Sequence, residues 1–285
     1  MVKDADNNLL ARFEEYLVRL GLSPATVVNY RADMRGVARW CVESGQGCSL
    51  LNLTADDVRA YCQHLRVARG LSPATVNRRL QAIRKFYDFA RQASLIGSNP
   101  GADVRPIQVP PTSRRALDAD EIARLLEAVQ AGRPSLVKRD YAIIQLLLQT
   151  GIKVGELTEI QLADIELTDS RGTLTVTGNG GNSHRCIPLN APACQALQEY
   201  LRVRPPSPGV KHLFLSQEGR SISARTVQRL VNVHTRAADL TGVSAHTLRY
   251  TFATSMLEET GDVATVANLL GHRSVETILR YTSKS

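Results

Sequence analysis

The sequence has few aromatic residues and no long apolar segment. Aromatic side chains make up 5% of its 285 residues, so aliphatic side chains must fill most of any core. No stretch approaches the roughly 18 apolar residues of a membrane helix, so no transmembrane helix is expected. The first residues also lack the basic segment followed by an apolar run that marks a secretory signal. We therefore expect a cytoplasmic protein without membrane association.

Cysteines are also few, and their spacing is irregular. The five are Cys41, Cys48, Cys62, Cys186 and Cys194. Their odd number and the lack of any CxxC pair argue against a disulfide framework and against a zinc site. We expect a reducing environment and no bound metal.

The overall composition is that of a soluble globular protein with an excess of basic residues. Hydrophobic residues at 43% and charged residues at 22% argue against disorder, and the length fits two domains. Lys and Arg outnumber Asp and Glu by 35 to 27, which gives a formal net charge of +8. This excess suits a polyanionic partner such as nucleic acid, although many basic proteins bind none.

The N-terminal part contains an internal repeat. The letters GLSPATV begin at Gly21 and again at Gly70. In each copy a serine, Ser23 or Ser72, stands where a helix N-cap belongs, and the proline after it suits the first helical position. The repeat predicts two similar helical hairpins.

The helix of the second copy has one apolar stripe and one basic face. The stripe recurs at helical spacing and consists of Val76, Leu80, Ile83, Tyr87 and Ala90. The basic residues off this stripe are Arg78, Arg79, Arg84, Lys85 and Arg91. Such a face is either solvated or in contact with phosphates, and both interpretations stay open at this point. Our candidate DNA-binding residues are Thr75, Arg78, Arg79 and Lys85.

A proline-rich segment divides the chain. Four prolines lie between Ser98 and Ala116, and proline removes backbone donors and restricts the residue before it, so an extended segment is expected. We predict a helical domain over residues 1–108, a linker over 109–116 and a second domain over 117–285.

The second domain is predicted to be mostly helical with a small sheet. Asp118 and Glu121 have the spacing of a capping box at a helix start. Residues 141–150 are apolar almost all round and stop at Gly151, which indicates a helix buried at the centre of the domain. Residues 172–177 and 184–188 are strand candidates joined by a segment rich in glycine and asparagine, which predicts a hairpin.

Three C-terminal segments carry a specific signature. HTLRYTFAT spans 246–254, LLGHRS spans 269–274, and Tyr281 lies in ILRYTSKS. In residue identity, order and spacing they resemble the tyrosine recombinases of the phage integrase family. The signature boxes of that family read H-x-L-R-H-x-F-A-T and L-G-H, followed by a tyrosine. The resemblance implies a mainly α fold, a two-domain clamp. Its N-terminal, SAM-like helical domain would bind DNA, and its catalytic domain would contain a small antiparallel sheet.

The chemistry of DNA strand exchange suits these residue types. A covalent tyrosyl phosphate stores the phosphodiester energy, so neither an external energy source nor a cofactor is needed. The phenol must lose a proton, the transition state gathers charge on nonbridging oxygens, and the leaving 5′ oxygen must gain a proton.

The resemblance assigns a role to four residues. Tyr281 is the nucleophile, and Arg249 donates two parallel hydrogen bonds to the scissile phosphate. His246 assists proton transfer, and His272 hydrogen-bonds a phosphate oxygen. Each residue type alone is more often a packing or ion-pair residue, but the four together at family spacing favour the functional interpretation.

Two positions depart from the family pattern. The first box, T-G-x-R-x-x-E-L, reads TGIKVGEL here, so Lys153 stands in place of the first catalytic arginine and lacks its planar fork. Asn179 stands where a hairpin lysine protonates the leaving oxygen, and asparagine cannot act as an acid near neutral pH. His184 or Arg185 could replace that lysine. We keep Lys153 in the catalytic set and expect a slowed reaction, by roughly 10²–10³ for one lost donor.

The leading hypothesis is a site-specific recombinase that forms a 3′-phosphotyrosyl intermediate. It would be a monomer when free and a tetramer on double-stranded DNA with inverted half-sites. A catalytically silent DNA-binding relative with an accessory or regulatory role is the alternative, motivated by Lys153 and Asn179. A type IB topoisomerase would share the tyrosine chemistry, but the chain length and the repeated N-terminal helices favour a recombinase.

Overall fold

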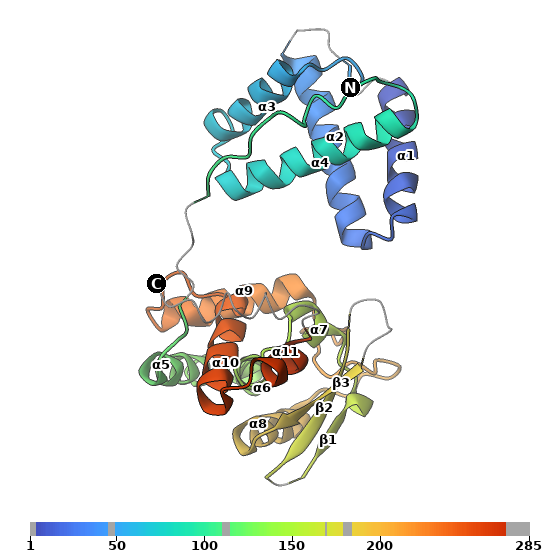
Figure 1. Cartoon of the computed structure of the whole chain (residues 1–285). Helices are drawn as coiled ribbons and strands as arrows, with labels where there is room; N and C mark the ends of the chain where they lie inside the picture. The colour runs from blue at the N-terminus through green and yellow to red at the C-terminus, as the bar shows by residue number, and fades with distance from the viewer. Residues whose placement is uncertain (1–3, 45–48, 110–114, 169, 179–183, 272–285) are drawn as a thin grey trace. The chain divides into compact units, whose positions relative to one another are not determined.

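The computed structural model describes residues 4–44, 49–109, 115–168, 170–178 and 184–271, and the chain divides into two compact units after Pro111 (Figure 1). Each unit has a hydrophobic core of its own. No helix within these described ranges is long and apolar enough to cross a membrane.

The described part of the first unit consists of helices and their connections. The helices are α1 (Asp4–Arg19), α2 (Pro24–Glu43), α3 (Ala55–Val67) and α4 (Pro73–Gln92). The predicted repeat is confirmed, because α2 and α4 have the same length and each begins after a serine that accepts a hydrogen bond from a backbone N–H. The apolar stripe predicted for α4 is also confirmed, since all five of its residues are buried.

The proline-rich segment begins as part of this first unit. Residues 98–109 form no helix or strand and run back along α4 (Figure 1). The amide of Asn77 on α4 donates to Ile107 O (2.7 Å) and accepts from Ile107 N (2.8 Å), while Val104 is buried in the core. Side chains of α4 thus supply partners for a backbone that makes no regular structure.

The second unit contains a group of helices and one small sheet among its described residues. The helices are α5 (Ala119–Gln130), α6 (Pro134–Thr150), α7 (Val154–Glu159), α8 (Ala191–Val203), α9 (Ala224–Ala237), α10 (Ala245–Thr260) and α11 (Val263–Leu270), with a 3-10 turn, η1 (Leu162–Asp164). The strands are β1 (Ile165–Leu167), β2 (Gly172–Thr177) and β3 (His184–Leu189).

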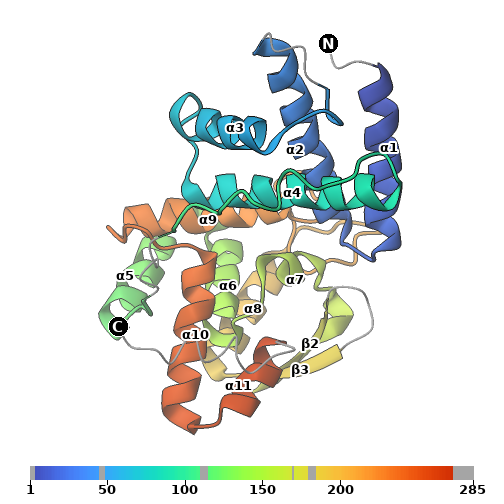
Figure 2. The ribbon, with the colours of Figure 1, turned by 45° about the horizontal axis from the view of Figure 1, so that its top comes forward.

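Helix α6 forms the centre of this unit, as its apolar sequence predicts. It packs against α5, α8 and α10, which surround it in Figure 2. It ends at Gly151, whose φ of 58° is left-handed, so the predicted glycine stop is confirmed. The predicted capping box is confirmed too, because Asp118 and Glu121 exchange hydrogen bonds between side chain and backbone.

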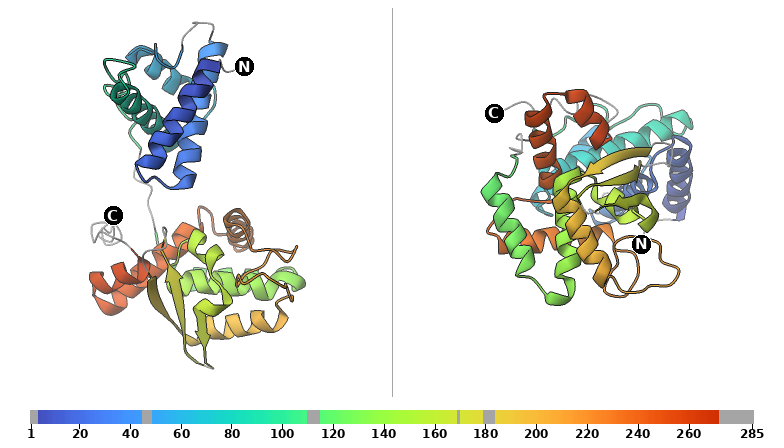
Figure 3. Two further views of the ribbon diagram at one scale, coloured as in Figure 1. Left: turned by 90° about the vertical axis from the view of Figure 1, so that its right-hand side faces the viewer. Right: turned by 90° about the horizontal axis from the view of Figure 1, so that it is seen from below.

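The predicted hairpin is part of a three-stranded antiparallel sheet. β2 pairs with β3 from Thr177↔His184 to Gly172↔Leu189, and β1 pairs with the other edge of β2 (Figure 3). β1 was not predicted, because its three residues are too few to show an alternating pattern. β3 packs against α6 and α11, which brings the sheet next to the C-terminal end of the described chain.

Candidate active site

Three of the predicted catalytic residues line one cavity in the second unit. It has a volume of about 350 Å³ and lies where the α6–α7 junction faces α9 and the start of α10. Lys153 comes from the junction, and His246 and Arg249 come from the first turns of α10. Gln228 and Asn232 on α9 also line the cavity and were not predicted as site residues. Two polar residues at i and i+4 carry no signature by themselves. The complete lining is Ile152, Lys153, Val154, Gln228, Asn232, Ser244, Ala245, His246 and Arg249.

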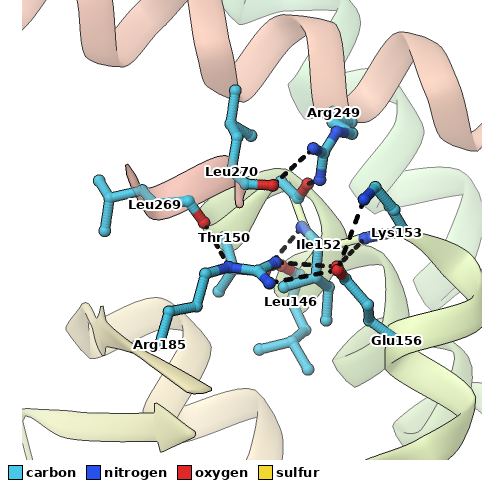
Figure 4. Close-up of polar contacts among 10 residues, drawn as sticks. Leu146, Thr150, Ile152, Lys153, Glu156, Arg185, Arg249, Leu269 and Leu270 are labelled. Atoms are coloured by element: carbon cyan, nitrogen blue, oxygen red, sulfur yellow. Dashed lines mark hydrogen bonds and ion pairs between the residues drawn. The ribbon is translucent and has the colours of Figure 1, made fainter. Parts of the chain in front are cut away.

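Arg249 is buried and connects two helix ends. One of its terminal nitrogens donates to Gly151 O and the other donates to Leu270 O (2.7 Å), so α10 is tied to the ends of α6 and α11 (Figure 4). A Cβ at Gly151 would lie 2.9 Å from the Leu270 side chain and closer still to Phe252. The glycine of the T-G box is therefore required by close packing as well as by its left-handed conformation.

A buried carboxylate forms the other half of this network. The Glu156 side chain on α7 is 3% exposed and accepts two hydrogen bonds from Arg185 on β3, at 3.1 and 2.8 Å. It also accepts one from Lys153 N at 2.8 Å (Figure 4). Burial by itself raises the pKa of Glu156, but the hydrogen bonds from Arg185 and the Lys153 backbone, with the two positive charges, lower it overall.

Arg185 also holds the end of α11. Its Nε donates to Leu269 O (2.8 Å), next to the Leu270 carbonyl that Arg249 holds. A Cβ at Gly271 would lie 2.8 Å from an Arg185 nitrogen, so the glycine of the L-G-H box makes room for this guanidinium. The guanidinium groups of Arg185 on β3 and Arg249 on α10 thus hold the C-terminal end of α11 in place.

Lys153 is placed differently from the two arginines. Its side chain is 47% exposed, and its Nζ lies 3.8 Å from Glu156 Oε1, which is an ion pair but too long for a hydrogen bond. Its backbone N–H is the group that contacts Glu156 closely. Lys153 therefore lines the cavity while its ammonium makes no hydrogen bond to the Glu156 carboxylate.

Neither residue proposed as a replacement for the hairpin lysine suits that role. Arg185 is engaged with Glu156 and with the end of α11. His184 is exposed, and its ring lies 3.1 Å from the Thr177 hydroxyl on the neighbouring strand. Because side chains alternate along a strand, His184 points to the face opposite Arg185 and away from this network. His272, Tyr281 and Asn179 lie outside the described residues.

In the first unit, two of the candidate DNA-binding residues share a carboxylate. Arg78 makes a two-bonded contact with Asp33 on α2, and the Nε of Arg79 lies 3.5 Å from the same carboxylate. The Asp33 side chain is only 7% exposed, whereas Arg78 is 44% exposed. The single negative charge of Asp33 therefore offsets one of the two positive charges of Arg78 and Arg79.

Two further basic residues of α4, Arg84 and Lys85, differ in their contacts. Arg84 donates to the carbonyls of Gly101 and Val104, so it holds the returning segment rather than facing outward. Lys85 is half-buried and forms no ion pair with a carboxylate in the described ranges. Thr75 belongs to the first turn of α4, where its hydroxyl lies 2.9 Å from that of the N-cap serine.

Comparisons with known proteins agree with this architecture. The family described as "Phage integrase family" matches residues 115–285, and "Phage integrase, N-terminal SAM-like domain" matches residues 10–94. Tyrosine recombinase XerC of Alcanivorax borkumensis is 34% identical over 288 residues, covering 98% of this chain and 91% of that protein.

Two solved structures are similar to the whole chain. The crystal structure of XerA recombinase has 28% identity and a TM-score of 0.55, covering 98% of this chain and 94% of that one. A lambda integrase tetramer bound to a Holliday junction has 21% identity and a TM-score of 0.72, covering 96% and 76%. At this identity the second likeness shows the fold alone.

Proposed function

Because this chain belongs to the phage integrase family, we propose that it is a site-specific DNA recombinase that cuts and rejoins strands through a 3′-phosphotyrosyl bond. The observation that carries the proposal is the shared cavity of Lys153, His246 and Arg249. Lys153 comes from one segment of the sequence and the pair His246 and Arg249 from another, and a protein that only bound DNA would not need them to converge.

Arg249 is suited to hold the scissile phosphate. Its position is set by carbonyls at the ends of α6 and α11, and a guanidinium has five N–H donors, so these two bonds are compatible with phosphate contacts. His246 takes the phenol proton, Tyr281 attacks phosphorus, and His272 hydrogen-bonds a phosphate oxygen. The Leu270 carbonyl that Arg249 holds lies two residues before His272 in the chain.

The proposed partner is double-stranded DNA with inverted half-sites. The formal charge of +8 favours association with phosphates, and residues 1–108 would be the DNA-binding domain, joined by residues 109–116 to a catalytic domain over 117–285. Thr75, Lys85 and the exposed part of Arg78 are the contacts we propose on α4. The free protein would be a monomer and would form a tetramer on DNA. Its location would be that of its substrate, the cytoplasm.

Covalent trapping tests this function directly. Nicked duplexes tiled across the DNA that flanks the protein's own gene would be incubated with the protein, and adducts would be resolved on a denaturing gel. Mass spectrometry of the adduct peptide is expected to place the DNA on Tyr281. The matched control is Tyr281→Phe, which removes one hydroxyl. A shift of DNA mobility without any adduct across the tiled set would contradict the proposal.

A further inference from the structure

Strand cleavage needs a proton donor that the usual hairpin position does not supply. The leaving 5′ oxygen is an alkoxide unless it is protonated as its bond to phosphorus breaks, and general acids contribute roughly 10²–10⁴ to such steps. The chain has six lysines, and none lies between Lys153 and Lys211, so the β2–β3 hairpin contains no lysine. His184 and Arg185 are directed elsewhere.

The cavity itself offers two groups that can release a proton readily. Its ionisable residues are Lys153, His246 and Arg249. A guanidinium is too weak an acid to protonate the leaving oxygen. The ordinary pKa of a lysine ammonium is about 2–3 units below that of arginine, so lysine is the stronger acid. An in-line displacement puts the attacking phenol and the leaving oxygen on opposite sides of phosphorus, so one residue cannot serve both. If His246 takes the phenol proton, Lys153 remains for the leaving oxygen.

The surroundings of Lys153 suit a mobile acid. Arg185 and the Lys153 backbone N–H already occupy the oxygens of Glu156, so the ammonium stays at 3.8 Å instead of closing a hydrogen bond. The buried carboxylate still attracts the ammonium of Lys153, a residue that lines the cavity. The N–H groups of the ammonium thus remain available for a substrate oxygen, and the four-carbon stem can move the ammonium to that oxygen.

We infer that Lys153 is the general acid of strand cleavage and so takes over the work of the missing hairpin lysine, an assignment that rests on the proposed function. As the bond from Tyr281 Oη to phosphorus forms, the bond from phosphorus to the 5′ oxygen breaks. One Nζ proton moves to that oxygen, and the phenol proton moves to His246. On resealing, the neutral amine of Lys153 takes a proton back from the attacking 5′ hydroxyl.

Sulfur substitution at the leaving atom separates this role from phosphate binding. A site located by covalent trapping would be synthesised with either oxygen or sulfur at the bridging 5′ position, because a thiolate leaves without being protonated. Lys153→Ala is expected to lose about 10²–10⁴ in cleavage rate on the oxygen substrate. On the sulfur substrate it should cleave within about tenfold of the parent protein, since only the acid step has been removed.

Two further variants serve as matched controls. Lys153→Arg keeps the charge but cannot release a proton, so it should be slower than the parent protein on oxygen and at least as fast on sulfur. Arg249→Ala should lose activity on both substrates, because its guanidinium acts on nonbridging oxygens. Thermal melting of each variant checks folding, and Lys153→Met offers a second deletion of the charge with a similar stem.

Each outcome decides between definite alternatives. Equal losses for Lys153→Ala on oxygen and sulfur would overturn the inference and leave Lys153 as a phosphate ligand only. Sulfur rescue of His246→Ala, but not of Lys153→Ala, would transfer the acid role to His246. If covalent trapping yields no adduct with the parent protein, the proposed function fails before the sulfur test is reached, and the inference fails with it.

Discussion

Replacing Arg185 with methionine tests whether the buried network around Glu156 supports the second unit. The change removes the two hydrogen bonds to Glu156 and the one to Leu269 O, but keeps a long apolar stem on β3. Glu156 would then be a carboxylate that is 3% exposed, with one backbone N–H and a distant ammonium as its partners. A buried charge without its counterion is strongly destabilising.

The magnitude follows from the geometry. Removing one partner of a buried ion pair costs about 3–5 kcal/mol, and the remaining Lys153 ammonium at 3.8 Å offsets part of that cost. We therefore expect a loss of about 3 kcal/mol in the free energy of unfolding. With a urea dependence of about 2 kcal/mol per molar, this corresponds to a midpoint lower by about 1.5 M.

Two optical signals together distinguish the units. Its single tryptophan, Trp40, lies in α2, so tryptophan fluorescence follows the first unit, whereas far-UV circular dichroism follows helices of both. Arg185→Met should therefore lower the urea midpoint of the second unit, which is seen by circular dichroism, and leave the midpoint seen by tryptophan fluorescence unchanged. Adding Glu156→Gln removes the unpaired charge and keeps an acceptor for Lys153 N, so the double variant should be more stable than Arg185→Met alone.

Acidification supplies an independent check. The pKa of Glu156 in the folded protein is lower than its ordinary value of 4.5, so the ion pair stabilises fully above that value and is lost as pH falls through the folded pKa. The stability gap between the parent protein and Arg185→Met should therefore narrow below pH 4.5. A midpoint for Arg185→Met within about 0.3 M of the parent at neutral pH would show that the ion pair contributes little, since that shift corresponds to well under 1 kcal/mol.

Three further predictions concern catalysis and DNA binding. Tyr281→Phe should leave DNA affinity in a mobility-shift assay unchanged and abolish the covalent adduct, and an adduct that persists would remove Tyr281 as the nucleophile. Lys153→Arg combined with Asn179→Lys should raise the single-turnover cleavage rate at least about tenfold, since it restores both the forked donor and a hairpin acid; an unchanged rate would show that the site works as it stands. Lys85→Ala should reduce the slope of log K for DNA binding against log salt concentration by about one. Arg84→Ala should instead lower the urea midpoint seen by tryptophan fluorescence, because Arg84 holds the returning segment. The reverse pattern would contradict our assignment of the two side chains.

Local features and family signatures could be predicted without the tertiary structure. The serine caps of α2 and α4, the capping box of α5 and the glycine stop of α6 each depend on residues a few positions apart, so pattern and mechanism were enough. The motif HTLRYTFAT identified His246 and Arg249 because both residues stand at the family's positions within one short segment.

The pairing of distant charges, by contrast, depends on which elements pack together in the folded chain. Arg185 contacts Glu156 and Leu269, and Arg78 contacts Asp33, across separations that no local pattern encodes. The sequence gives no sign of these partners, since Arg78 lies off the apolar stripe of a helix and Arg185 lies in a strand of the hairpin. Whether a basic side chain faces phosphate or a buried carboxylate depends on which elements pack together, because an ion pair needs its partner within about 4 Å whatever the separation along the chain.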